Sequence, residues 1–202
     1  MLGLLDRLLY RRWFEGRDAT SYARDARPAF GDLDDRLLDG LALDGVARLL
    51  DLGSGPATFA ARARVRFPTL HVIAVDPSRT FGPRSTLRAC GEALPLADRS
   101  IDVAVCLSSI RHVADRAQTL RELRRVATRV TIVELDPAAS RQRIAAHAQR
   151  LGTRLLRLGF GPLVCRTAPH AEAIARLAEA AGFRRVTLRP DPIQPVYILD
   201  LE

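Results

Sequence analysis

The sequence has no lysine, and its net charge of +8 rests entirely on arginine. A phosphate-binding loop of the G-x-x-x-x-G-K-[ST] type needs a lysine that reaches the phosphates. Because this chain cannot supply one, a nucleotide site of that class is excluded. The arginines are unevenly spread: residues 1–44 hold seven against nine acidic residues, whereas residues 137–189 hold ten against two. The basic excess therefore belongs to the C-terminal part of the chain.

Cysteine is scarce too. Cys90, Cys106 and Cys165 lie far apart, and no two of them form a CxxC pair. Disulfide frameworks and zinc sites usually show closer, paired spacing, so we expect neither, and we expect no metal. Free thiols fit a reducing compartment, which predicts a cytoplasmic protein.

Long apolar runs are also missing. No stretch approaches about eighteen uncharged apolar residues, so we expect no transmembrane segment. The apolar start MLGLLDRLLYRRWF is interrupted by Asp6 and Arg7, and no small-residue cleavage site follows it. This start does not have the pattern of a secretory signal, and we expect it to form a lid helix; the alternative is a membrane anchor.

What the sequence does contain is an alternation of short β-rich runs with longer helical patterns. The β-rich runs are nearly continuous in apolar residues, as in parallel strands covered on both faces. This order predicts an α/β fold: a Rossmann-like, mostly parallel, seven-stranded sheet with helices on both faces. We expect strands near 47–51, 70–75, 86–89, 101–107, 129–135, 186–190 and 196–202, and helices near 29–43, 57–66, 115–127, 138–158 and 168–181.

The stretch LLDLGSGPAT at 49–58 joins a buried strand to a turn with two glycines. A dinucleotide loop reads G-x-G-x-x-G, but Thr58 stands where the third glycine belongs, which argues against NAD. A carboxylate at Asp51 would repel a pyrophosphate and attract a positively charged ligand. S-adenosylmethionine carries a sulfonium and an ammonium. The alternative is a glycine turn that only closes a strand-to-helix junction.

A second carboxylate ends the next strand. IAVDPS places Asp76 at the tip of that strand, where it could accept both hydroxyls of a ribose. The alternative is an Asx turn before Pro77. Only about ten residues separate Asp76 from the next possible strand, and a parallel crossover normally takes about a dozen or more. We therefore expect a shortened crossover, with a turn in place of a helix.

Two further stretches complete the pattern: GEALPLADRSIDVAVCLSSIRHVAD at 91–115 and LRELRRVATRVTIVELDP at 120–137. With the two earlier motifs, and with AGFRRVTL at 181–188, the chain resembles the class I S-adenosylmethionine-dependent methyltransferases. The resemblance is to the small-molecule group that includes enzymes of ubiquinone and menaquinone biosynthesis, and it runs from about residue 46 to 190.

The resemblance implies S-adenosylmethionine as the cofactor and a small-molecule methyl acceptor. Asp51 and the glycine turn would line the methionyl end, Asp76 would hold the ribose, and the EALP stretch would meet the adenine. The implied cofactor residues are Asp51, Gly53, Ser54, Gly55, Asp76, Pro77, Glu92, Ala93, Leu94 and Leu107. The chain departs from the family pattern at Cys90, where an aspartate is usual, and at Ala57, which replaces a glycine.

His112 is the candidate catalytic base. Methyl transfer from a sulfonium is an in-line displacement in which positioning can supply about 7–11 kcal/mol, so a base is needed only if the acceptor must lose a proton. His112 follows the fourth predicted strand and titrates near working pH. The alternative is a histidine that packs against or caps the next helix. Ser108 and Ser109 have the same two interpretations.

The predicted helix at 138–158 carries two parallel rows of side chains. The apolar row is Ile144, Ala148, Leu151, Leu155 and Leu158, and a basic row one position earlier is Arg143, His147, Arg150, Arg154 and Arg157. The basic row could face an anionic acceptor, nucleic acid or an anionic membrane. The alternative is a solvated face whose arginine stems lie on the core.

Other function classes fit less well. Base-modifying methyltransferases carry Asn/Asp-Pro-Pro-aromatic or Pro-Cys motifs after the fourth strand, where this chain has CLSS, and a ribose methylase with two lysines is excluded. RNA methylation is thus disfavoured. A non-catalytic S-adenosylmethionine-binding or partner subunit remains open, because Cys90 and the short crossover depart from the pattern.

Nothing in the length of 202 residues calls for a second domain. We expect one methyltransferase-like domain over 1–202. Its parts are cap helices in 1–44, a cofactor-binding core in 45–137, a cap insertion in 138–166, and the last helix and terminal strands in 167–202.

Overall fold

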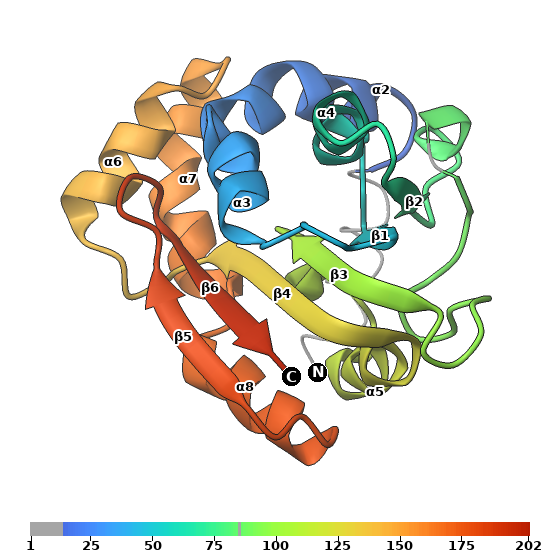
Figure 1. The fold of residues 1–202 in the computed structure, drawn as a ribbon. Helices are drawn as coiled ribbons and strands as arrows, with labels where there is room; N and C mark the ends of the chain where they lie inside the picture. Colours follow the sequence, from blue (N-terminus) through green and yellow to red (C-terminus); the bar gives the residue numbers. More distant parts are fainter. Residues whose placement is uncertain (1–13, 85) are drawn as a thin grey trace.

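A computed structural model describes residues 14–84 and 86–202 of the chain (Figure 1). The lid helix predicted from Leu2, Leu5, Leu9 and Trp13 lies outside the described residues. These residues form one sheet of six strands in the order β2-β1-β3-β4-β6-β5. Four neighbouring strands run parallel, and β6 runs antiparallel to both β4 and β5. The strands are β1 Arg48–Leu52, β2 His71–Val75, β3 Ile101–Leu107, β4 Ala127–Leu135, β5 Val186–Pro190 and β6 Val196–Leu201.

Helices cover both faces of the sheet (Figure 1). Side chains alternate along a strand, so Val103 and Val105 join the core under α3, α4, α6 and α7, while Ala104 and Cys106 join the core under α5 and α8. The α-helices are α2 Gly16–Ser21, α3 Leu33–Gly40, α4 Thr58–Arg66, α5 Arg116–Val126, α6 Arg141–Gln149, α7 Arg154–Thr167 and α8 Ala171–Ala180. Shorter helical turns are η1 Tyr22–Ala26, η2 Arg27–Phe30, η3 Gly82–Arg84 and η4 Ile110–His112.

The α/β class, the mostly parallel sheet and the helices on both faces agree with the sequence prediction, but the described sheet has six strands, not seven. The strand expected at 86–89 is reduced to a single parallel bridge between Leu87 and Val75. Thr86 and Leu87 both donate backbone N–H bonds to the carbonyl oxygen of Ala74, at 2.7 and 3.0 Å. In its described residues, the crossover that leads there contains a single helical turn, η3, as its length predicted.

The single helix predicted over 138–158 is wrong. It divides at Gly152 into α6 and α7, because the Gly152 N–H donates to the carbonyl oxygen of Asp25 at 2.7 Å. An alanine there would place its Cβ 2.9 Å from the Cα of Asp25. After the break, the Thr153 side chain accepts a hydrogen bond from Leu156 N and caps α7.

The predicted basic row therefore does not form one surface. Arg143 donates to the backbone oxygens of Asp191 and Gln194 and so ties α6 to the loop before β6. His147 is buried, stacks on Phe160 with ring centroids 4.6 Å apart, and pairs through Nδ1 with the Gln194 side chain at 2.7 Å. Arg143 and His147 thus hold α6 to the loop between β5 and β6, so neither side chain is available to a partner.

Candidate functional site

The glycine loop after β1 is bound to the end of the neighbouring strand. Gly53 and Ser54 both donate N–H bonds to the carbonyl oxygen of Val75, at 2.8 and 3.1 Å. Gly53 has φ +71°, and a Cβ there would lie 2.4 Å from the Cβ of Ser109. Ser109, just after β3, donates its hydroxyl to Leu52 O at 2.8 Å. The turn is thus closed on two sides, and only glycine fits at its first position.

Asp51 lies at the tip of β1 with 1% of its surface exposed. Burial raises its pKa to about 7, and the nearby Arg27 guanidinium only partly opposes this effect. Arg27 is itself paired with Asp34 at 2.6 Å. Within residues 14–84 and 86–202, Asp51 Oδ2 has no hydrogen-bond partner. A buried carboxylate oxygen with nothing to accept fits the positively charged end of a ligand.

Asp76 lies on the other side of the same loop, with 7% of its surface exposed. Its Oδ2 accepts the N–H of Gly55 at 2.8 Å, and its Oδ1 accepts the N–H of Ser78 at 2.8 Å. The second bond is the Asx turn considered as the alternative. Burial raises the pKa of Asp76, although both backbone bonds lower it. Each carboxylate oxygen has a second lone pair, so this bracing leaves Asp76 able to accept ligand hydroxyls.

The segment 14–16 lies across the loop that follows Asp76. The Glu15 carboxylate accepts the N–H groups of Arg79 and Thr80 at 2.9 and 3.2 Å, and Gly16 N donates to Thr80 Oγ1 at 2.7 Å. Burial raises the pKa of Glu15, but these hydrogen bonds outweigh it and the net shift is downward. An open cavity of ≈ 580 Å³ adjoins this contact, lined by Gly16, Arg17, Thr20, Ser21, Arg24 and Thr80.

Two of the predicted adenine residues have hydrogen-bond partners in α5 or just before it. Glu92 Oε1 accepts the N–H groups of Ala114 and Asp115, at 2.6 and 3.0 Å. Leu94 N donates to Glu122 Oε2 at 2.8 Å. These bonds join the loop before β3 to α5. Three other predicted positions sit at strand ends or in loops: Pro77 and Ala93 are exposed, and Leu107 is half-buried at the end of β3.

His112 lies in η4, just beyond the end of β3. Its Nε2 accepts a bond from Arg111 Nε at 3.1 Å, and its ring meets the edge of Phe14 at 4.9 Å. Burial, and then the charges of Arg111 and Arg116, hold the pKa of His112 well below its usual range, so the ring is neutral at pH 7. The bond from Arg111 places the imidazole proton on Nδ1.

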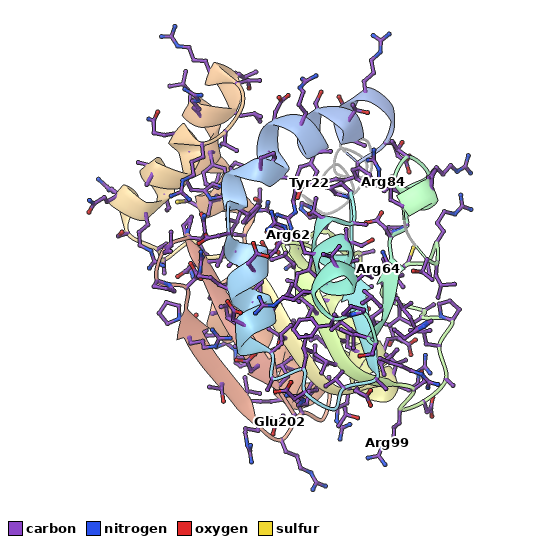
Figure 2. All side chains as sticks on the ribbon, turned by 45° about the horizontal axis from the view of Figure 1, so that its top comes forward. Tyr22, Arg62, Arg64, Arg84, Arg99 and Glu202 are labelled. Atoms are coloured by element: carbon purple, nitrogen blue, oxygen red, sulfur yellow. The ribbon has the colours of Figure 1, made fainter. Side chains whose placement is uncertain are left out.

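Several residues of this edge were not predicted. Glu134, at the end of β4, is fully buried; the Arg111 side chain lies 3.6 Å from it, and Arg111 N points at its Oε2 from 3.4 Å. Tyr22 lies on the inner side of the segment above the sheet edge (Figure 2), 4.0 Å from where a Gly55 Cβ would stand. The sequence contained a signal for Glu134, because this acid stands at the end of an apolar strand, as Asp51 does. Tyr22 had none, because it reaches the site from a distant part of the chain.

Comparison with known proteins agrees with this geometry. The family model described as "Methyltransferase domain" matches residues 50–133, which include the glycine loop, Asp76 and the end of β3. A ubiquinone/menaquinone biosynthesis C-methyltransferase from Syntrophotalea carbinolica is 33% identical over 98 residues, 43% of this chain and 41% of the relative. A demethylmenaquinone methyltransferase from Roseiflexus sp. is 30% identical over 166 residues, 70% of each chain.

The fold agrees as well. The crystal structure of an S-adenosylmethionine-dependent methyltransferase from Aquifex aeolicus superposes with a TM-score of 0.66 at 15% identity, covering 90% of this chain and 96% of that one. The glycine turn, the unpaired oxygen of Asp51 and the second carboxylate at Asp76 fit the donor and acceptor groups of S-adenosylmethionine. This chain therefore belongs to the class I S-adenosylmethionine-dependent methyltransferases.

Proposed function

We propose that this chain moves the methyl group of S-adenosylmethionine to a small-molecule acceptor by in-line transfer. The observation that carries the proposal is the pair of buried carboxylates, Asp51 and Asp76, on either side of one glycine loop. The free oxygen of Asp51 accepts the ammonium of the methionyl end. Asp76, already held by two backbone N–H groups, accepts the ribose hydroxyls.

When bound, the cofactor supplies an electrophilic methyl group on its sulfonium. The backbone of Gly53, Ser54 and Gly55 lines the methionyl end and orients it. The cover formed by Glu15 and Tyr22 excludes water from the loop, which strengthens every charge interaction beneath it. Contacts of Pro77, Glu92, Ala93, Leu94 and Leu107 with the adenosine remain predictions.

For the acceptor, we propose a small molecule with an acidic oxygen, which approaches from the side of η4. In support, Arg111 Nη1 and Ser108 Oγ are buried there without a hydrogen-bond partner in the described residues. The names of two relatives place them in quinone methylation, which agrees with such an acceptor. A cytoplasmic location also remains part of the proposal.

His112 as the base also remains a prediction. A neutral imidazole can take a proton, but Nε2 is the acceptor of the Arg111 bond, so protonation there requires Arg111 to turn away. An acceptor oxygen that draws the Arg111 guanidinium toward itself would free that nitrogen at the same moment. A His112→Gln variant with full turnover between pH 5 and 8 would remove His112 from the mechanism.

Calorimetric titration with S-adenosylhomocysteine and with NAD tests the cofactor assignment. Asp76→Ala removes the acceptor of the ribose hydroxyls and of Gly55 N, and charge-assisted hydrogen bonds contribute roughly 1.5–3 kcal/mol each. Affinity for S-adenosylhomocysteine should fall at least about tenfold. Asp76→Asn keeps one acceptor oxygen, so its affinity for S-adenosylhomocysteine should fall less. If the parent binds NAD more tightly, or if Asp76→Ala binds like the parent, the assignment is wrong.

A further inference from the structure

Helix α7 has an apolar outer face. Leu155 is 81% exposed and Leu158 is 71% exposed, and Pro162 continues their line at the spacing of one helix face. The opposite face of the same helix buries Phe160 and Val164. Large apolar side chains are normally buried. A row of exposed ones on one helix face therefore indicates an interaction surface. We call Leu155, Leu158 and Pro162 the outer row.

The sequence of α7 makes a weak helix by itself. Gly159, Gly161 and Pro162 lie in its interior, and these two residue types are the poorest helix formers. Packing on one side by Phe160 and Val164 must offset this low propensity. A second contact on the outer row would add to the same stabilisation. The composition of the helix thus fits an element that is completed by a partner.

The charge around the outer row has one sign. Residues 141–167 contain six arginines and no acidic residue. Arg154 and Arg166 are exposed and flank the outer row on its two sides at helical spacing. In the described part of the chain neither makes an ion pair with a carboxylate. Helices α6 and α7 lie on one side of the molecule, beside α3 (Figure 1).

We propose that the outer row and its flanking arginines dock on an anionic lipid surface. A helix that presents leucines between arginines matches the acyl boundary and the negative headgroups of such a surface at once. A second copy of this chain fits less well, because a two-fold contact would bring the arginines of the two copies together. Nucleic acid fits less well too, because phosphates offer nothing to the exposed leucines.

The docking would be peripheral. No helix in residues 14–84 and 86–202 is long and apolar enough to cross a bilayer. The turn between α6 and α7 contacts the segment over the glycine loop, through the bond from Gly152 N to Asp25 O. Lipid contact at α7 would therefore lie beside the cover of the site. This surface goes beyond methyl transfer and needs no activity to be observed.

Vesicle co-sedimentation tests the proposal with the full chain. We expect binding to vesicles that contain phosphatidylglycerol, weak binding to pure phosphatidylcholine, and loss of binding at high salt. Leu155→Ser with Leu158→Ser should lower partitioning roughly tenfold or more. Val65→Ser is the matched control, since Val65 is 82% exposed on α4, outside this surface, and it should bind like the parent.

A second variant tests the role of the flanking arginines. Arg154→Gln with Arg166→Gln should weaken vesicle binding and make it less dependent on salt. Arg176→Gln with Arg184→Gln removes the same charge from an exposed region around the end of α8 and should bind like the parent. For every variant, sedimentation equilibrium measures the oligomeric state and circular dichroism checks that the chain is folded. The proposal is overturned if the leucine variant binds as the parent does, if both lipids bind equally, or if the parent is a dimer that the leucine variant dissociates.

Discussion

At the scale of single residues, Gly53 is the most constrained position of the glycine loop. Gly53→Ala must place a Cβ 2.4 Å from that of Ser109 while keeping φ at +71°. The left-handed conformation costs roughly 1–2 kcal/mol, and the displacement of Ser109 adds about 1–3 kcal/mol. We expect urea denaturation to show a loss of roughly 2–5 kcal/mol in unfolding free energy.

Gly55→Ala is the control for this prediction. Gly55 also has positive φ, +52°, but its added Cβ would meet only Phe81 and Tyr22, at ordinary contact distances of 3.9 and 4.0 Å. The loss should then be limited to the conformational cost, roughly 1–2 kcal/mol. Equal losses in the two variants would mean that Ser109 is not the obstacle.

Asp51 should make stability depend on pH. Its folded pKa of about 7 lies above the ordinary value of 3.8, so the folded state holds the proton more tightly. The stabilisation is complete below about pH 4 and is lost as the pH rises to about 7, by on the order of 4 kcal/mol. Asp51→Asn has no such proton. The unfolding free energy of the parent should therefore fall relative to that of the variant as the pH rises from about 4 to about 7.

The same proton should control cofactor affinity. Above about pH 7 the Asp51 carboxylate is charged and attracts the ammonium of S-adenosylhomocysteine, so affinity should rise between pH 5.5 and 8. Titration calorimetry on the parent and on Asp51→Asn measures this directly. A rise of the same size in Asp51→Asn would mean that a group other than Asp51 controls the affinity.

At the scale of elements, the contact between the α6–α7 turn and η1 depends on Gly152. A Cβ there would meet the Cα, Cβ and Oδ1 of Asp25 at 2.8 to 2.9 Å, and a backbone atom cannot turn aside. Gly152→Ala should therefore destabilise the fold by about 1–3 kcal/mol. In Gly159→Ala, inside α7, no described atom lies within 4 Å of the new Cβ. That variant should gain up to about 1 kcal/mol from helix propensity.

Thermal denaturation of both glycine variants measures these opposite shifts. Cofactor titration adds a second readout, because η1 begins with Tyr22, which lies over the glycine loop. Gly152→Ala should weaken S-adenosylhomocysteine binding, and Gly159→Ala should leave it unchanged. If Gly152→Ala is as stable as the parent, the turn tolerates separation from Asp25.

At the scale of the whole molecule, we expect one cooperative unfolding transition. One core cluster joins β1, β3 and β4 to the cap helices α3, α6 and α7, so the cap and the sheet share their buried surface. S-adenosylhomocysteine at about one hundred times its Kd should add about 2.7 kcal/mol and raise the melting temperature by roughly 5–10 °C. Scanning calorimetry with and without ligand measures both. Two transitions, with only one shifted by ligand, would mean that the cap is a separate unit.

Much of the fold and of the cofactor loop can be predicted from the sequence, because the signals are local. Apolar runs mark β1 to β4, and parallel strands bring their carboxyl ends to one edge, so Asp51 and Asp76 had to lie there together. The short stretch after Asp76 likewise allowed only a turn. These features depend on the order of neighbouring residues and not on distant contacts.

Other features depend on packing between distant segments. The apolar row of 144–158 looks uniform in sequence, yet Ile144 and Leu151 are buried while Leu155 and Leu158 are exposed, because Asp25 binds Gly152 and breaks the helix between them. Glu92 acquired its hydrogen-bond partners at Ala114 and Asp115, and His112 its ring contact with Phe14, in the same way. A residue's type and spacing restrict what it can bind, but the elements folded against it determine which of its atoms remain free.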